Sequence, residues 1–134
     1  MFASAILNFT VGTFLAGIGV LAMREVDKKR ELFFAAAPLL FGVIQLIEGM
    51  IWLSFGEGLL KTYQNGLSFA VVFFTYALWP VYSPTSVWAI EPNRVRRTAM
   101  FLFVAMGYVL GFYFLQYLLN APFDVTVVND KLHY

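Results

Sequence analysis

The chain has 134 residues, of which 60% are hydrophobic and only 13% are charged, whereas soluble domains carry about 25% charged residues. A small globular domain buries only about 60–70% of the surface of its unfolded chain, so this composition excludes an ordinary soluble domain and predicts a membrane protein. The net charge of +1 excludes a strong overall field for nucleic acid, and the absence of cysteine excludes disulfides, thiolate metal sites and thiol catalysis.

The first predicted element is a membrane helix over residues 3–23. No charged side chain precedes Arg24, whereas a cleavable signal peptide begins with a positive segment, so we expect a resident helix and not a leader. A stripe of small and polar residues runs along it: Ser4, Asn8, Gly12, Ala16 and Gly19. Such a stripe lets two membrane helices approach closely. Packing within the protein is the preferred interpretation, and a homo-oligomer face is the alternative.

The second predicted helix, 32–55, contains Glu48 in its outer half. An ionisable group inside a membrane is costly and usually faces other helices. Gln45 and Trp52 lie three residues before and four after it, on the same face. Together with polar residues at a similar level in the first and fourth helices, the predicted intramembrane site consists of Asn8, Gln45, Glu48, Trp52 and Gln116. Hydrogen bonding between helices is the preferred role, and a proton- or cation-handling Glu48 or a ligand pocket are the alternatives.

The third predicted helix, 67–90, contains the run Leu78-Trp79-Pro80-Val81-Tyr82-Ser83-Pro84. Each proline removes a backbone donor and crowds the carbonyl four residues earlier. We therefore predict that this helix is kinked or broken at Pro80 and Pro84. The residues of the predicted break are Trp79, Pro80, Tyr82 and Pro84. A packing kink repaired by a neighbouring hydroxyl is the preferred interpretation, and an ion or substrate site on unwound backbone is the alternative.

The fourth predicted helix covers residues 98–119, and its Gly107 and Gly111 are expected to allow close packing. The tail, 120–134, differs because its residues Asp124–Val128 alternate weakly, as a short strand or a surface segment does, unless the tail leads into further membrane structure. His133 is the only histidine, with only Asp130 near it in sequence. We predict no metal site, no cofactor and no catalytic residue.

The connections between these helices are short, which makes neighbouring helices antiparallel. The sequence therefore predicts an all-α polytopic membrane helix bundle with four transmembrane helices, forming one domain over residues 1–134. Connections 24–31 and 91–97 hold seven of the nine lysine and arginine residues. Because cytoplasmic loops carry an excess of such residues, we expect both connections to be cytoplasmic and both termini to lie outside, in the inner membrane of a bacterial cell.

Two elements of the sequence resemble the signature of an uncharacterised family of bacterial multi-pass membrane proteins. They are the Gln-x-x-Glu-Gly-x-x-Trp element within 38–52 and the Leu-Trp-Pro-x-Tyr-x-Pro element of 78–84, which is followed by Glu91-Pro92 and a basic loop. The opening residues 1–5 resemble the family's start but lack its cysteine, so no role of that thiol is carried over. The resemblance spans nearly the whole chain and implies no activity. It implies members with about seven helices, so that this chain is a short member, a truncated one, or one completed by a second copy.

The preferred function is that of an accessory or structural subunit of a membrane assembly, because the short connections leave little room for a soluble catalytic site. The expected partners are membrane lipids and other membrane subunits or a second copy of the chain, and not nucleic acid. One alternative is a small proton- or cation-coupled transporter or channel, a homo-oligomer with Glu48 in its pathway. Another is a lipid- or quinone-binding protein with its ligand near Trp52, and an enzyme is the less favoured class.

Overall fold

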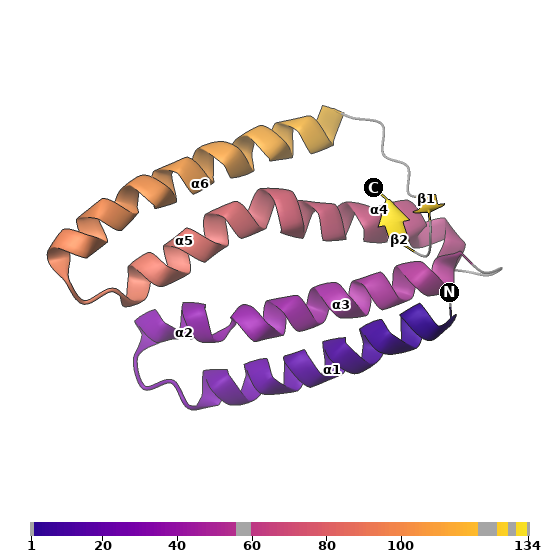
Figure 1. The fold of residues 1–134 in the computed structure, drawn as a ribbon, viewed down its shortest axis with the longest axis horizontal. Coiled ribbons are helices and arrows are strands. Elements are labelled where there is room, and N and C mark those ends of the chain that lie inside the picture. Colours follow the sequence, from indigo (N-terminus) through magenta and orange to yellow (C-terminus); the bar gives the residue numbers. More distant parts are fainter. Residues whose placement is uncertain (1, 56–59, 121–125, 129–130, 134) are drawn as a thin grey trace.

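The computed structural model describes residues 2–55, 60–120, 126–128 and 131–133 (Figure 1). Its helices and strands are, in chain order, α1 (Phe2–Arg24), α2 (Lys29–Ala35), α3 (Ala37–Ser54), α4 (Leu60–Val72), the π-helical segment η1 (Phe73–Leu78), α5 (Trp79–Ile90), α6 (Arg94–Asn120), β1 (Thr126–Val128) and β2 (Lys131–His133). Four helical stretches are long and apolar enough to cross a membrane: Ala3–Arg24, Lys29–Ser54, Thr62–Ile90 and Arg94–Asn120. The predicted all-α bundle with four spans is confirmed.

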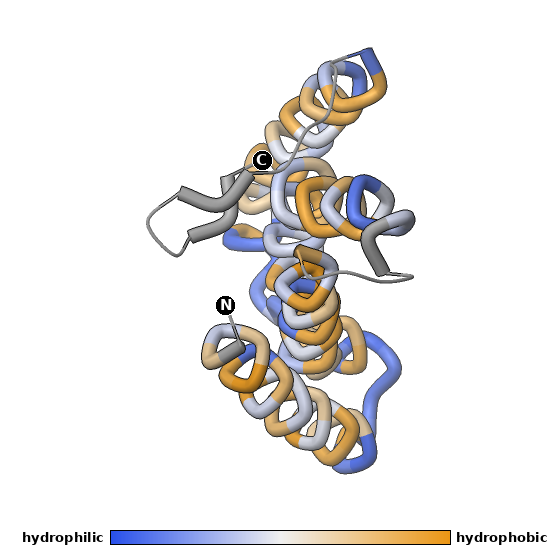
Figure 2. Tube along the Cα trace, turned by 90° about the vertical axis from the view of Figure 1, so that its right-hand side faces the viewer, coloured by the Kyte–Doolittle hydropathy of each residue, from blue (hydrophilic) through white to orange (hydrophobic). Residues whose placement is uncertain are grey.

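The four spans lie side by side in chain order as an open row. α1 packs on α3, the span of α2 and α3 packs on that of α4 and α5, and α6 packs on α5 and η1. Figure 1 shows α1 at one edge of the row and α6 at the other, and Figure 2, which looks along the helices, shows the same order. Each edge helix therefore has one side without a helical neighbour, and large apolar side chains are exposed there, such as Phe14 (69%) and Val109 (70%).

The second span is two helices rather than the single predicted helix, because α2 ends at Ala35 and α3 begins at Ala37. Pro38 stands in the first turn of α3. It has no N–H to continue the hydrogen bonding of α2. The N–H of Ala36 closes α2 by donating to the carbonyl of Leu32 over 3.0 Å.

The third span does not break at Pro80 or Pro84, so the predicted kink there is not confirmed. Pro80 lies in the first turn of α5, where a missing N–H is tolerated, and α5 continues through Pro84. The irregular part is η1, which comes just before Pro80. The N–H of Trp79 donates to the carbonyl of Phe74, five residues back. Widening this turn accommodates Pro80 without unwinding the helix.

The ends of the row differ in charge. The α1–α2 and α5–α6 connections lie at one end, and the start of α1 and the β1–β2 hairpin lie at the other (Figure 1). In the hairpin Val127 pairs with Leu132. The described basic residues of the connections therefore gather at one end of the helices; they are Arg24, Lys28, Lys29, Arg30, Arg94, Arg96 and Arg97. This arrangement is the one that the alternation of four antiparallel spans requires.

Candidate functional site

Gln45 and Glu48 form the polar pair predicted on α3. The side-chain Nε2 of Gln45 donates to Oε2 of Glu48 over 3.4 Å, and both side chains are half-buried. Glu48 stands six residues before Ser54, the last residue of α3, which puts it about 9 Å along the axis from the helix end. The carboxyl group therefore lies within the apolar part of the span, with one long hydrogen bond to the part of the chain that the structure describes.

Asn8 on α1 and Trp52 on α3 lie in the same pair of packed helices as Gln45 and Glu48. Trp52 is 6% exposed on α3. Asn8 is half-buried on α1, next to Phe9, whose ring packs so closely on Gly49 that a Cβ atom there would lie 3.1 Å from it. The α1–α3 interface thus brings Asn8 to the level of Glu48.

Gln116 lies apart from the other predicted residues of this site. It is exposed on α6, and the span of α4 and α5 separates that helix from α3 (Figures 1 and 2). The backbone carbonyl of Gln116 accepts a hydrogen bond from Nδ2 of Asn120 over 2.7 Å. Because the spans form a row and not a ring, a residue on α6 does not reach α3 even at a similar depth.

The small residues predicted on α1 lie in its interface with α3. A Cβ atom at Gly12 would lie 3.0 Å from the carbonyl oxygen of Gly42, and one at Gly42 would lie 2.6 Å from the backbone nitrogen of Ala16. Gly19 abuts the backbone of Leu39 in the same way. The stripe lets the two backbones approach closely, as the interpretation of internal packing requires.

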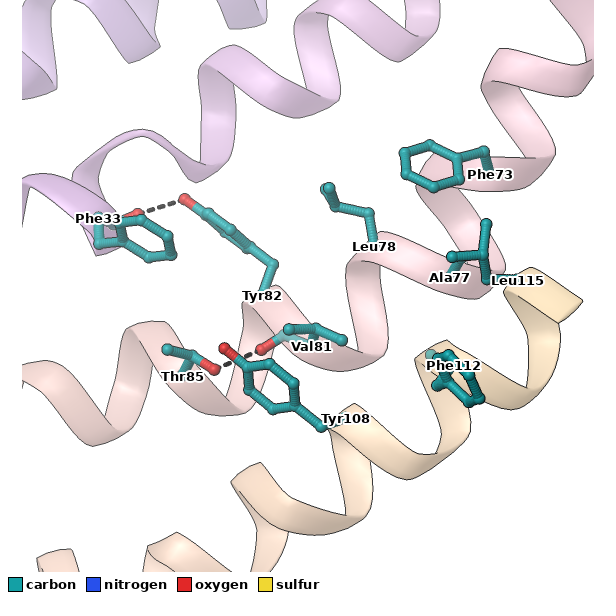
Figure 3. Close-up of a pocket in the computed structure, with 11 residues that line it drawn as sticks. Phe33, Phe73, Ala77, Leu78, Val81, Tyr82, Thr85, Tyr108, Phe112 and Leu115 are labelled. Atoms are coloured by element: carbon teal, nitrogen blue, oxygen red, sulfur yellow. Dashed lines mark hydrogen bonds between the residues drawn. The ribbon is translucent and has the colours of Figure 1, made fainter.

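The aromatic residues of the 78–84 element join α5 to the second span. The ring of Trp79 lies 4.4 Å from that of Phe41 on α3, and the ring of Tyr82 lies 5.0 Å from that of Phe33 on α2. The Tyr82 hydroxyl also donates a hydrogen bond to the backbone carbonyl of Phe33 (Figure 3). That carbonyl belongs to the last turn of α2, where helical carbonyls lack partners, so Tyr82 satisfies the backbone at the α2–α3 break.

The prolines of the same element face α6. Pro84 deprives the carbonyl of Pro80 of its helical donor, and this carbonyl points at Gly107, against which Pro84 also packs. One turn away, a Cβ atom at Gly111 would lie 2.6 Å from the carbonyl oxygen of Ala77. Glycines on α6 thus admit the backbone of the third span, and a Cα–H group facing a carbonyl offers a weak hydrogen bond in place of the missing one.

Two hollows lie between α5 and α6. One of them, of about 350 Å³, also borders η1 and α2 and is shown in Figure 3. Its lining is almost entirely apolar and consists of Phe33, Phe73, Ala77, Leu78, Val81, Tyr82, Thr85, Tyr108, Gly111, Phe112 and Leu115. A second hollow of about 400 Å³ lies toward the connection between the two helices, lined by Thr85, Trp88, Phe101, Val104, Ala105 and Tyr108. Both share Thr85 and Tyr108, so they adjoin.

The sequence profile of a family of unknown function, DUF6629, matches residues 1–128. The chain belongs to DUF6629. This membership agrees with the resemblance to an uncharacterised family. No curated protein and no solved structure matches the chain, so the family brings no activity, and the function has to be argued from the site.

Sequence reasoning missed the residues that line the α5–α6 hollows of this DUF6629 protein. Phe33, Thr85 and Tyr108 carry no motif, because an aromatic residue in a membrane helix is ordinary. One signal was present: Phe101, Tyr108 and Phe112 recur on α6 near the helical period, on the side that also carries Gly111. Among the residues that the structure describes, no three His, Asp or Glu side chains lie together as metal ligands would. The side chain of His133 lies outside that description.

Proposed function

We propose that this DUF6629 protein is a structural or accessory subunit of a membrane assembly, and that the Gln45–Glu48 face of α3 is where a partner helix docks. The observation that carries the proposal is the half-buried Glu48 in an open row of helices. An ionisable side chain at this depth costs a few kcal/mol unless it is covered or paired. Among the described residues its one hydrogen bond, to Gln45 at 3.4 Å, leaves most of its hydrogen-bonding capacity free.

A partner helix with polar side chains would complete this pair. Polar residues hold membrane helices together because lipid offers them no alternative partners. The exposed apolar side chains of the two edge helices fit the same function, since lipid or further helices cover them equally well. A second copy of the chain and a different membrane subunit are both compatible with these features. The mass of the purified particle distinguishes the two partners.

The orientation belongs to the same proposal. The end of the row that carries the basic connections lies in the cytoplasm, and the start of α1 and the hairpin lie outside the inner membrane. The excess of arginine and lysine at one end supports it.

The test is native mass spectrometry of the protein taken from membranes in mild detergent. We expect a particle heavier than one 15.2 kDa chain with lipid, and we expect Glu48→Leu to release the single chain because the variant removes the group that the partner pairs with. Gln116→Leu is the matched control, since it replaces an exposed polar residue on α6 and should leave the mass unchanged. A wild-type particle of one chain with lipid alone would refute the proposal.

The variant Glu48→Gln separates assembly from proton or cation handling, the second candidate, which rests on the same carboxyl group. Glutamine keeps the hydrogen-bonding capacity but cannot carry charge, so the assembled mass should persist. Proton or cation flux into vesicles that contain the protein would disappear in this variant if Glu48 lies in a pathway, and an accessory subunit would show no such flux in the wild type.

A further inference from the structure

The apolar hollows between α5 and α6 have no role in the proposed assembly function. We propose that they form one groove that binds an acyl chain of an anionic phospholipid, with the lipid phosphate at the arginines that begin α6. The lining of the groove includes neither Gln45 nor Glu48, so the inference does not depend on the assembly proposal.

The groove is long enough for a lipid chain. It extends along the third span from Phe73 to Trp88, fifteen residues or about 22 Å at 1.5 Å per residue. The hydrocarbon of one leaflet is only about 15 Å deep, half of a ~30 Å core. A chain that enters at the Trp88 end therefore finds apolar wall over its whole length.

The walls select an alkyl chain over a polar solute. Aromatic and aliphatic side chains form most of the lining, and two of the hydroxyls in it are already used. The Tyr82 hydroxyl donates to the Phe33 carbonyl, and Oγ1 of Thr85 donates to the Val81 carbonyl over 2.6 Å. Figure 3 shows both hydroxyls turned toward backbone carbonyls. Such a surface offers dispersion contacts and few unused donors.

Positive charge stands at the Trp88 end of the groove. The guanidinium carbon of Arg97 lies 4.3 Å from the centre of the Trp88 ring, and Trp88 lines the hollow at that end. Arg94 and Arg96 belong to the same turn of α6, and Arg96 pairs with Glu91 over 3.2 Å. Three arginines against one glutamate leave a net positive charge at the membrane surface.

An arginine held over an aromatic ring is suited to hold a phosphate. The ring attracts the cation, and the five N–H groups of the guanidinium bind phosphate oxygens in pairs. A basic pocket between membrane helices is a physical match for an anionic headgroup. The charge at the entrance and the apolar wall behind it together specify an anionic lipid rather than a zwitterionic one.

The test measures lipid that stays bound to the whole protein. The protein is reconstituted into vesicles of phosphatidylcholine with phosphatidylglycerol, extracted in mild detergent and weighed by native mass spectrometry during stepwise delipidation. We expect one phosphatidylglycerol to persist per chain after phosphatidylcholine has been lost. Equal persistence of the two lipids would overturn the role of charge, and loss of both together would overturn the site.

Two variants localise the bound lipid. Ala105 lines the hollow near Trp88 and is itself exposed, so Ala105→Trp fills the groove without moving backbone and should abolish retention. Arg97→Gln removes one cation and should lower retention about fivefold, the effect of one basic residue at a membrane surface. Each variant is first shown to keep the helicity and monodispersity of the wild type.

Matched controls complete the test. Val109→Trp adds the same bulk on α6 at a position that is 70% exposed and lines neither hollow. Arg24→Gln removes a cation at the same end of the row but on α1, the far edge. Both controls should retain phosphatidylglycerol like the wild type. If the two controls lose as much lipid as Ala105→Trp and Arg97→Gln, the lipid binds to the whole surface of the protein without preference, and the proposed groove is not its site.

Discussion

At the scale of single residues, the hydroxyl group of Tyr82 joins the third span to the second. It supplies a donor to the Phe33 carbonyl at the point where Pro38 divides the second span. We expect Tyr82→Phe to lower the free energy of unfolding by about 1 kcal/mol, since a hydrogen bond between membrane helices is worth about that or somewhat less. Equilibrium unfolding in mixed detergent micelles, followed by circular dichroism, measures the change.

The control for this prediction is Tyr63→Phe, because Tyr63 is 61% exposed on α4 and should change the free energy of unfolding by a few tenths of a kcal/mol or less. If Tyr82→Phe behaves like this control, the hydroxyl is not needed at the α2–α3 break, and the stacking of its ring on Phe33 is what joins the two spans.

The sequence predicts local pairs better than distant ones. Gln45 and Glu48 are three residues apart on one helix, so their contact follows from helical geometry alone, and the structure has that contact. Gln116 shares a depth with them, but depth does not say which helices are neighbours. Likewise the partner of Tyr82 could not be predicted, since it is a backbone carbonyl 49 residues away that carries no mark in the sequence.

At the scale of the elements, the third and fourth spans approach each other through glycines. We expect Gly107→Ala to destabilise the protein by about 1–3 kcal/mol, the usual cost of overpacking, because the added methyl group would run into the Pro80 carbonyl and the Pro84 ring. Thermal unfolding in detergent measures the loss.

The matched variant is Gly17→Ala on α1, where a Cβ atom meets nothing within 4 Å. Alanine favours helix over glycine by about 1 kcal/mol, so this variant should be neutral or stabilising. An equal loss of stability in both variants would show that the glycines act through backbone freedom. The close approach of α6 to the third span would then not be the reason that Gly107 is needed.

The positions of the prolines in the sequence do not determine which of them interrupts a helix. Four spans follow directly from the apolar stretches, which exceed the length needed to cross a bilayer. The sequence predicts a break at Pro80 and Pro84, yet the irregular turn comes earlier, in η1, because a proline crowds the turn that precedes it. No break is predicted at Pro38, which stands where the second span divides. Which proline interrupts a helix depends on whether neighbours replace the lost hydrogen bonds, and that requires the tertiary structure.

At the scale of the whole molecule, the uneven distribution of basic residues predicts a sidedness that can be measured. The chain has no cysteine, so single cysteines report directly on exposure. In bacterial cells, Asp27→Cys in the α1–α2 connection should be protected from a membrane-impermeant thiol reagent, and Thr62→Cys at the other end of the row should be labelled. The reverse pattern would invert the proposed orientation, and labelling of both sites in intact cells would contradict a single sidedness.

The open row also bears on how the protein is made. Each span packs on the spans next to it in sequence, and α1 does not have to find α6, so the main contacts join spans that are neighbours in the chain. The helical hairpin of α1 and α3 can close before the later spans leave the ribosome, and α6 then needs only α5 and η1. Biogenesis can proceed as a succession of nearest-neighbour steps, and the last step, the docking of α6, is the one that creates the groove between α5 and α6.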